Sequence, residues 1–315
     1  MRIVVFLVTL VVLAFVGYVA ISGYFLAHAT ASLLKSGPMA TALSSLEPPT
    51  DPLAPGYRGD PTAALSLPFD IVALDTELGP AEAWLVPATA AEAGRAIYVH
   101  GIAGAREDGY RALTILHEAG WSVLLISYRN DPDAPPAPEG SYGFGLTEWP
   151  DLEAAVTKMA PGDGDRVLVV ADSMGAAILG QFLAHSPAAP RVQAVALDSP
   201  AISFGAMIDQ MATEGGKPLP GLVAWTAKQI LRFKTSLPLA QAEVATPFVA
   251  FPGPMFLAHG SADRITPIGP AQALAAARTA PTVTLWTGAD DLGSYAEDPE
   301  AYRAAFKDFL SRLAP

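Results

Sequence analysis

The segment that most constrains the fold is residues 166–177, which read RVLVVADSMGAA. The apolar, mostly β-branched residues 167–170 predict a buried β-strand, and the residues after the turn predict a helix. Ser173 lies in the short turn between them. On such a turn a serine projects at the carboxyl edge of a sheet, beside the amino terminus of the following helix. The alternative is a serine that caps an ordinary strand-to-helix turn.

Composition allows a large core and excludes several classes of protein. Of the 315 residues, 51% are hydrophobic and 16% are charged, so we expect one large domain with an appendage. The net charge of −12 argues against a nucleic-acid partner. Cysteine is absent, which rules out disulfides and thiolate metal sites. Because no phosphate loop, dinucleotide fingerprint or metal-ligand cluster is visible, the sequence implies no cofactor and no metal.

The amino-terminal segment is long and apolar. Residues 3–26 carry no charge, and as a helix they extend about 36 Å, which exceeds the roughly 30 Å of a bilayer core. We therefore expect residues 1–28 to form a single-pass membrane anchor. Arg2 and the terminal amine favour a cytoplasmic amino end, which places the carboxyl-terminal domain outside the cytoplasm. The alternative is a signal peptide cleaved near Ala27-His28-Ala29, which yields a secreted protein.

Three further regions follow along the chain. Residues 29–67 are rich in proline and predict a linker. Residues 68–315 alternate between strands and helices, which predicts an α/β fold with a mostly parallel eight-stranded sheet flanked by helices. The expected strands are residues 69–75, 81–86, 96–99, 122–128, 167–170, 192–197, 254–258 and 283–286, of which the first two predict an antiparallel hairpin at one edge. The expected helices are residues 108–119, 148–159, 176–185, 271–278 and 299–313.

One stretch interrupts the alternation. Residues 200–246 contain no convincing strand, and residues 204–211 and 222–233 predict two helices. An insertion after the sixth strand lies over the carboxyl edge of the sheet, where open α/β sheets bind ligands. We therefore expect a small helical cap over the site, with an inert helical insertion as the alternative.

Two motifs resemble parts of the α/β-hydrolase superfamily. Ala171-Asp172-Ser173-Met174-Gly175 resembles its nucleophile elbow, G-x-S-x-G, with alanine in place of the first glycine. Residues 97–104, IYVHGIAG, are similar to its His-Gly loop after the third strand. The resemblance implies that Ser173 is the nucleophile and that the backbone N–H groups of Ile102 and Met174 form an oxyanion hole. It also implies that His100 shapes this loop and is not the base.

The family's two remaining catalytic positions are those of the triad carboxylate and the histidine, and the sequence matches the family motif only at the first. Residues 256–263, FLAHGSAD, resemble the family's His-Gly-x-x-Asp motif, which assigns Asp263 as the triad carboxylate; a surface aspartate in a turn is the alternative. Residues 288–295, GADDLGSY, follow the eighth strand, where the family has its catalytic histidine, and here Asp291 occupies that position. None of the five histidines, His28, His100, His117, His185 and His259, is placed to substitute.

The missing imidazole leaves two functional hypotheses open. A serine hydroxyl needs a base of near-neutral pKa, and an ordinary aspartate of pKa about 4 is a weak one, although burial and neighbouring carboxylates can raise it. The first hypothesis is a membrane-tethered serine hydrolase that acts on small carboxylic esters or related acyl compounds. The alternative is a weak or inactive pseudo-hydrolase that serves as a membrane-tethered binding domain.

Overall fold

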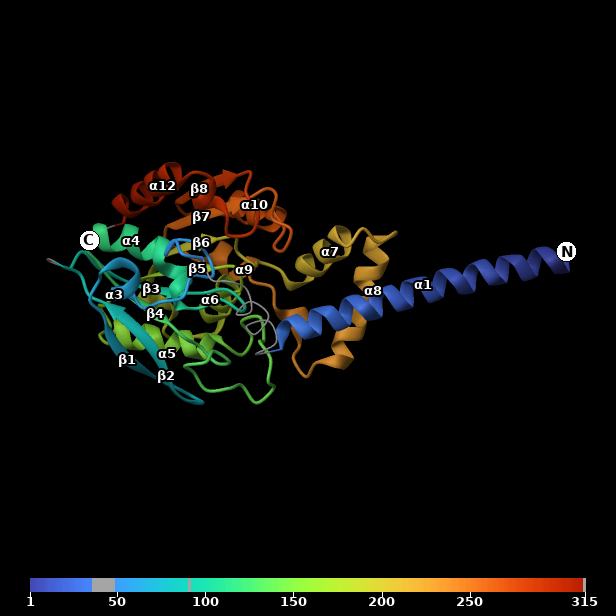
Figure 1. Ribbon diagram of the computed structural model, residues 1–315, viewed down its shortest axis with the longest axis horizontal. Helices are drawn as coiled ribbons and strands as arrows, with labels where there is room; N and C mark the ends of the chain where they lie inside the picture. Colours follow the sequence, from blue (N-terminus) through green and yellow to red (C-terminus); the bar gives the residue numbers. More distant parts are fainter. Residues whose placement is uncertain (36–48, 90–91, 314–315) are drawn as a thin grey trace.

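The computed structural model describes residues 1–35, 49–89 and 92–313. Its centre is an eight-stranded sheet with the order β1-β2-β4-β3-β5-β6-β7-β8 (Figure 1). All eight predicted strands are present, with small shifts at their ends. They are β1 (Asp70–Thr76), β2 (Gly79–Val86), β3 (Gly94–Val99), β4 (Trp121–Ile126), β5 (Val167–Asp172), β6 (Val192–Asp198), β7 (Met255–Gly260) and β8 (Thr282–Thr287).

The strand directions follow the expectation. β1 pairs with β2 in an antiparallel hairpin at one edge, and β2 is also antiparallel to β4. All pairs from β4 to β8 are parallel. The carboxyl ends of β3, β5, β6, β7 and β8 therefore meet at one edge of the sheet, and the loops after four of these strands carry the predicted site residues.

Helices cover both faces of the sheet because the parallel strands are apolar on both sides. Alternate residues of β3, such as Ile97 and Tyr98, belong to two separate apolar clusters on opposite faces. One face is covered by α5 (Trp149–Met159), α6 (Met174–His185), α9 (Ala245–Ala250) and α10 (Ile268–Ala277), and the other by α4 (Tyr110–Glu118) and α12 (Pro299–Ser311). Three short helices were not predicted: α3 (Pro61–Leu65), α9 and α11 (Ser294–Glu297).

Two cap helices follow β6, as the sequence predicts, and each is longer than expected. They are α7 (Phe204–Glu214) and α8 (Pro220–Lys234). Ser203 begins α7 with a side-chain cap, because its Oγ accepts a hydrogen bond of 2.9 Å from the amide of Ala206. Residues 215–219 connect the two helices at the outer end of the cap.

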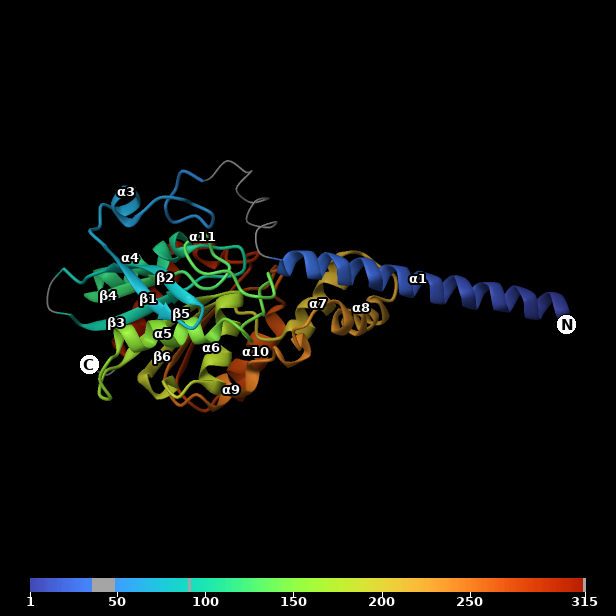
Figure 2. The same cartoon turned by 90° about the horizontal axis from the view of Figure 1, so that it is seen from below.

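The amino-terminal helix α1 (Arg2–Leu34) projects far beyond the sheet domain (Figures 1 and 2). It is long and apolar enough to cross a membrane, and its most hydrophobic 18-residue window is not buried in the protein. Its second half packs against the cap through a stripe of small side chains that includes Gly23, Ala27 and Thr30. A Cβ atom at Gly23 would lie 2.6 Å from the Cβ of Thr226, so only glycine permits this close approach to α8.

The predicted linker is residues 29–67. Residues 36–48 lie outside the described residues. The remainder contains turns and the short helix α3, whose first turn is capped by the carboxylate of Asp60. The helix α1 itself continues to Leu34, six residues past the boundary at residue 28 that the sequence suggested.

Candidate functional site

Ser173 occupies a strained turn between β5 and α6. Its backbone angles are φ 48° and ψ −117°, a conformation that side chains other than glycine rarely adopt. A Cβ atom at Gly175 would collide with the carbonyl oxygen of Val99, so the helix can begin this close to β3 only with glycine there. Ser173 Oγ makes no hydrogen bond with any described residue. The turn therefore has the geometry that presents a hydroxyl group to a ligand.

The loop after β3 lies directly against Ser173. A Cβ atom at Gly101 would be 3.0 Å from the Cβ of Ser173 and 3.6 Å from its Oγ. The amides of Ile102 and Met174 follow this contact on either side, and neither has a hydrogen-bond acceptor among the described residues. Unpaired N–H groups next to a hydroxyl are the donors that an oxyanion hole requires.

Both ring nitrogens of His100 face hydrogen-bond acceptors. Its Nε2 lies 2.9 Å from the Oδ2 of Asp131, and its Nδ1 lies 2.8 Å from the carbonyl oxygen of Gly101. The ring also stacks on Tyr128 at 4.3 Å between centroids. Burial disfavours the charged ring, but Asp131 and the Gly101 carbonyl outweigh it and raise the pKa of His100. Because both ring nitrogens face acceptors, His100 has no free lone pair with which to remove a proton.

Asp263 lies in the turn after β7, at the carboxyl edge of the sheet. Its carboxylate accepts hydrogen bonds from the amides of Ile265 and Thr266 at 2.9 and 2.8 Å, and from the Thr266 hydroxyl at 2.5 Å. His259 Nε2 is 3.2 Å from its Oδ2. Burial opposes ionisation, but these donors prevail and lower the pKa of Asp263. Asp263 is thus a fixed negative charge at the base of the site.

Asp291 has the most strongly shifted pKa in the loop after β8. Its Oδ1 is buried and has no hydrogen-bond partner among the described residues. Burial, reinforced by the negative charges of Asp263, Asp198, Asp172 and Asp290, raises the pKa of Asp291 to about 8. The interaction with Asp263 and Asp172 shows that the loops after β5, β7 and β8 converge on one buried region. A carboxyl group with such a pKa is much closer to an imidazole in basicity than an ordinary aspartate.

A buried polar network near Ser173 was not predicted from the sequence. Arg111 donates 2.8 Å hydrogen bonds to the Oδ2 of Asp172 and to the carbonyl oxygen of Leu292. Ser199 Oγ accepts a 3.0 Å hydrogen bond from the amide of Leu292. Asp172, the residue before Ser173, and Leu292, the residue after Asp291, are therefore hydrogen-bonded to the same guanidinium group.

The same network contains Asp198 at the end of β6. Tyr302 donates a 3.0 Å hydrogen bond to its Oδ2, whereas its Oδ1 has no partner among the described residues. Burial raises the pKa of Asp198, and the Asp172 pKa is also raised by burial, in spite of the nearby Arg111. The only sequence signal for these residues is an aspartate at the end of each apolar strand, at positions 172 and 198.

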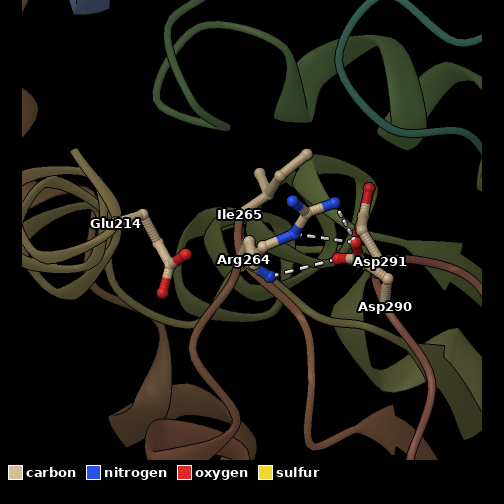
Figure 3. Close-up of a pocket in the computed structure, with 5 residues that line it drawn as sticks. All are labelled: Glu214, Arg264, Ile265, Asp290 and Asp291. Carbon is tan, nitrogen blue, oxygen red and sulfur yellow. Dashed lines mark hydrogen bonds and ion pairs between the residues drawn. The ribbon is translucent and has the colours of Figure 1, made fainter. Parts of the chain in front are cut away.

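A cavity of about 440 Å³ opens at Asp291 (Figure 3). It is lined by Glu214 from the end of the cap helix α7 and by residues of the loops after β7 and β8. Arg264 pairs with Asp290 at 2.5 Å across these two loops, which leaves Asp291 as the unpaired carboxyl group beside it. Among the described residues, no group of three or more His, Asp or Glu side chains could hold a metal ion.

Comparison of the whole structure with solved structures shows the fold. An esterase from Pyrococcus furiosus superimposes with a TM-score of 0.62 at 19% identity, over 85% of this chain and 100% of that one. An α/β hydrolase from Penicillium gives a TM-score of 0.58 at 17% identity, over 78% and 99% of the two chains. An esterase from Exiguobacterium antarcticum gives 0.55 at 12%, over 76% and 99%.

Sequence comparison alone finds nothing similar: no family model and no curated protein matches the chain. The fold is therefore shown by structural comparison alone. The chain has the α/β-hydrolase fold, with a mostly parallel eight-stranded sheet, flanking helices and a long apolar helix at its amino terminus.

Proposed function

We propose that the protein is a membrane-tethered serine hydrolase of small carboxylic esters, in which Asp291 replaces the usual histidine as the base. The observation that carries the proposal is the geometry of two loops: Ser173 lies on a strained turn, and Arg111 links the preceding residue, Asp172, to the loop that holds the buried carboxyl group of Asp291. Burial and neighbouring carboxylates raise the pKa of Asp291 to about 8. A base in this range can remove a serine proton near neutral pH. The structural likeness to esterases is consistent with this chemistry.

In this mechanism Ser173 Oγ attacks the ester carbonyl carbon while its proton moves to the Asp291 carboxylate. The carbonyl oxygen becomes an oxyanion, which the amides of Ile102 and Met174 stabilise. The tetrahedral intermediate then collapses, and the departing alkoxide takes the proton from Asp291. Water hydrolyses the acyl-enzyme by the same route, with Asp291 again as the base and Ser173 as the leaving group.

In this mechanism Asp263 keeps the pKa of Asp291 high, whereas the usual triad carboxylate orients a histidine. Its hydrogen bonds keep it ionised, so its charge opposes ionisation of Asp291 and maintains the high pKa of that carboxyl group. The pair therefore divides into one permanent anion and one group that exchanges a proton. Arg111 keeps the loop that carries Asp291 beside the nucleophile turn.

The test compares the full chain in detergent micelles with Ser173→Ala, Asp291→Asn and Asp291→His. Labelling of Ser173 by a fluorophosphonate and turnover of a chromogenic short-chain ester are measured for each. We expect measurable wild-type turnover that Ser173→Ala abolishes, and a loss of about 10²–10⁴-fold in Asp291→Asn. Wild-type turnover that Asp291→Asn leaves intact contradicts the role of Asp291. Absence of labelling and turnover in every variant contradicts the hydrolase and favours a binding domain.

A further inference from the structure

The outer end of the cap presents exposed apolar side chains. Leu219, Leu222 and Trp225 are 50%, 45% and 61% exposed, and they lie at and near the start of α8. The opposite side of the same helix, at Val223, Ala224 and Ala227, is buried. We call residues 217–225 the cap edge.

The cap edge and the adjoining residue Thr226 contact α1 near the middle of the helix. Tyr18 donates a 2.8 Å hydrogen bond to the carbonyl oxygen of Pro218, and Gly23 packs against Thr226. The part of α1 before these contacts is exposed throughout, from Met1 to Val16. The contact with the cap thus divides α1 into a free half and a packed half (Figure 1).

The free half of α1 is too short to cross a bilayer alone. Tyr18 is about 24 Å along the helix axis from Arg2, whereas the hydrocarbon core is about 30 Å thick. The charges of Arg2 and the terminal amine prevent the helix from sliding further into the core. If α1 spans the membrane, the Tyr18–Pro218 contact lies about 6 Å inside the outer hydrocarbon boundary. A tilted helix moves the contact deeper still.

The charge distribution of the cap agrees with this position. Residues 215–242 contain four basic residues and no acidic ones, in a chain whose net charge is −12. Lys228 pairs with Asp209, and Lys234 lies over the ring of Tyr24 at 4.9 Å. Basic side chains beside exposed leucine and tryptophan are typical of a surface that sits at the headgroup boundary.

We infer that the cap edge is embedded in the outer leaflet of the bilayer that α1 crosses. The inference rests on the membrane tether of the proposed function, but not on its chemistry. Glu214, which lines the cavity at Asp291, is only three residues from Lys217 of the cap edge. The cavity therefore opens close to the membrane surface, which favours amphipathic esters that partition into lipid as substrates.

The test uses the absence of cysteine from the chain. Three single-cysteine variants, Leu222→Cys, Ile71→Cys and Val11→Cys, are labelled with the fluorophore NBD and reconstituted as full chains in nanodiscs. Ile71 is the matched control, an apolar residue that is 64% exposed on β1, and this strand lies far from the free half of α1 (Figure 1). Val11 reports the anchor itself. Emission and quenching by nitroxide-bearing phosphatidylcholine are measured for each label.

We expect the labels at 222 and 11 to emit at shorter wavelength and to be quenched by the lipid nitroxide, and the label at 71 to be unaffected. Equal behaviour at 222 and 71 overturns the inference, as does an unquenched label at 11. No readout depends on catalysis, so an inactive protein with a quenched label at 222 refutes the hydrolase and leaves the embedded cap intact.

Discussion

The pH dependence of turnover is the sharpest consequence of an aspartate base. The pKa of Asp291 is raised to about 8 by burial and by four neighbouring carboxyl groups, so it is mostly protonated at neutral pH. A base with that pKa is about 9% ionised at pH 7, half ionised at pH 8 and about 91% ionised at pH 9. We therefore expect kcat/KM to rise about tenfold between pH 7 and pH 9.

Asp291→His provides the contrasting profile. An imidazole has an ordinary pKa of about 6.5, so the rise should move down by more than one pH unit and the rate should be nearly constant above pH 7.5. At pH 7 about 76% of an imidazole of that pKa is in the basic form, against about 9% of Asp291, so turnover at pH 7 should rise about eightfold. The assay is steady-state hydrolysis of a short-chain ester from pH 5 to 9.5, corrected for the spontaneous reaction. A wild-type profile that is constant above pH 7 would refute the assignment of Asp291.

The same proton can be detected without catalysis, through stability. The folded state raises the pKa of Asp291 from its ordinary value to about 8, so it retains a proton that the unfolded chain releases. The stabilisation is complete below about pH 4 and is lost as the pH rises to about 8, with a slope of about 1.4 kcal/mol per pH unit from this group. Asp291→Asn should flatten that slope and unfold at a higher temperature than wild type at pH 8. Parallel pH–Tm curves for the two proteins would show that Asp291 ionises normally.

Three further predictions concern the support of the site and of the cap. Ser173→Gly should abolish ester turnover and raise stability by about 1 kcal/mol in chemical denaturation, because it relieves a φ of 48°. Arg111→Leu should cost about 3–5 kcal/mol and lower the melting temperature, because it leaves the buried carboxylate of Asp172 without its ion pair; an unchanged Tm contradicts this. Gly23→Leu should separate α1 from the cap, since a Cβ there lies 2.6 Å from Thr226, and faster protease cleavage of the 215–219 loop would report it.

Much of the sheet domain is predictable from local patterns. Apolar runs such as residues 167–170 identify the strands, because parallel strands buried on both faces are continuously hydrophobic. The predictions for β5 and β6 stopped short of the strand ends, where the polar residues Asp172 and Asp198 continue the backbone pairing, whereas the prediction for β4 ran two residues too far. A polar side chain at the end of a strand does not prevent its backbone from pairing with the neighbouring strand. The run of apolar residues in the sequence therefore ends before the strand does.

The environment of the site is predictable from the sequence only in part. The position of Asp291 follows from its place after the eighth strand, and the sequence also suggests that burial and neighbouring carboxylates can raise its pKa. Three of the four carboxyl groups that contribute are 28 to 119 residues away along the chain, so only the fold identifies Asp198 and Asp172 among them. The partnership of His100 with Asp131 is equally non-local. The packing of α1 on the cap was missed as well, because Gly23 and Thr30 are inconspicuous in an otherwise uniform apolar helix.

The two functional hypotheses make different demands on position 291. A binding domain needs a side chain of suitable volume there, and asparagine provides it with no charge to bury. An ionisable group held among four other carboxyl groups, with one oxygen lacking any described partner, makes the fold less stable as the pH rises. Strain in the Ser173 backbone is a second destabilising feature, in the turn that Arg111 links to the Asp291 loop. A strained serine turn and a loop with a buried carboxyl group, both hydrogen-bonded to Arg111, suit proton transfer to and from a serine and favour the proposed hydrolase, whereas binding alone gives no reason for either.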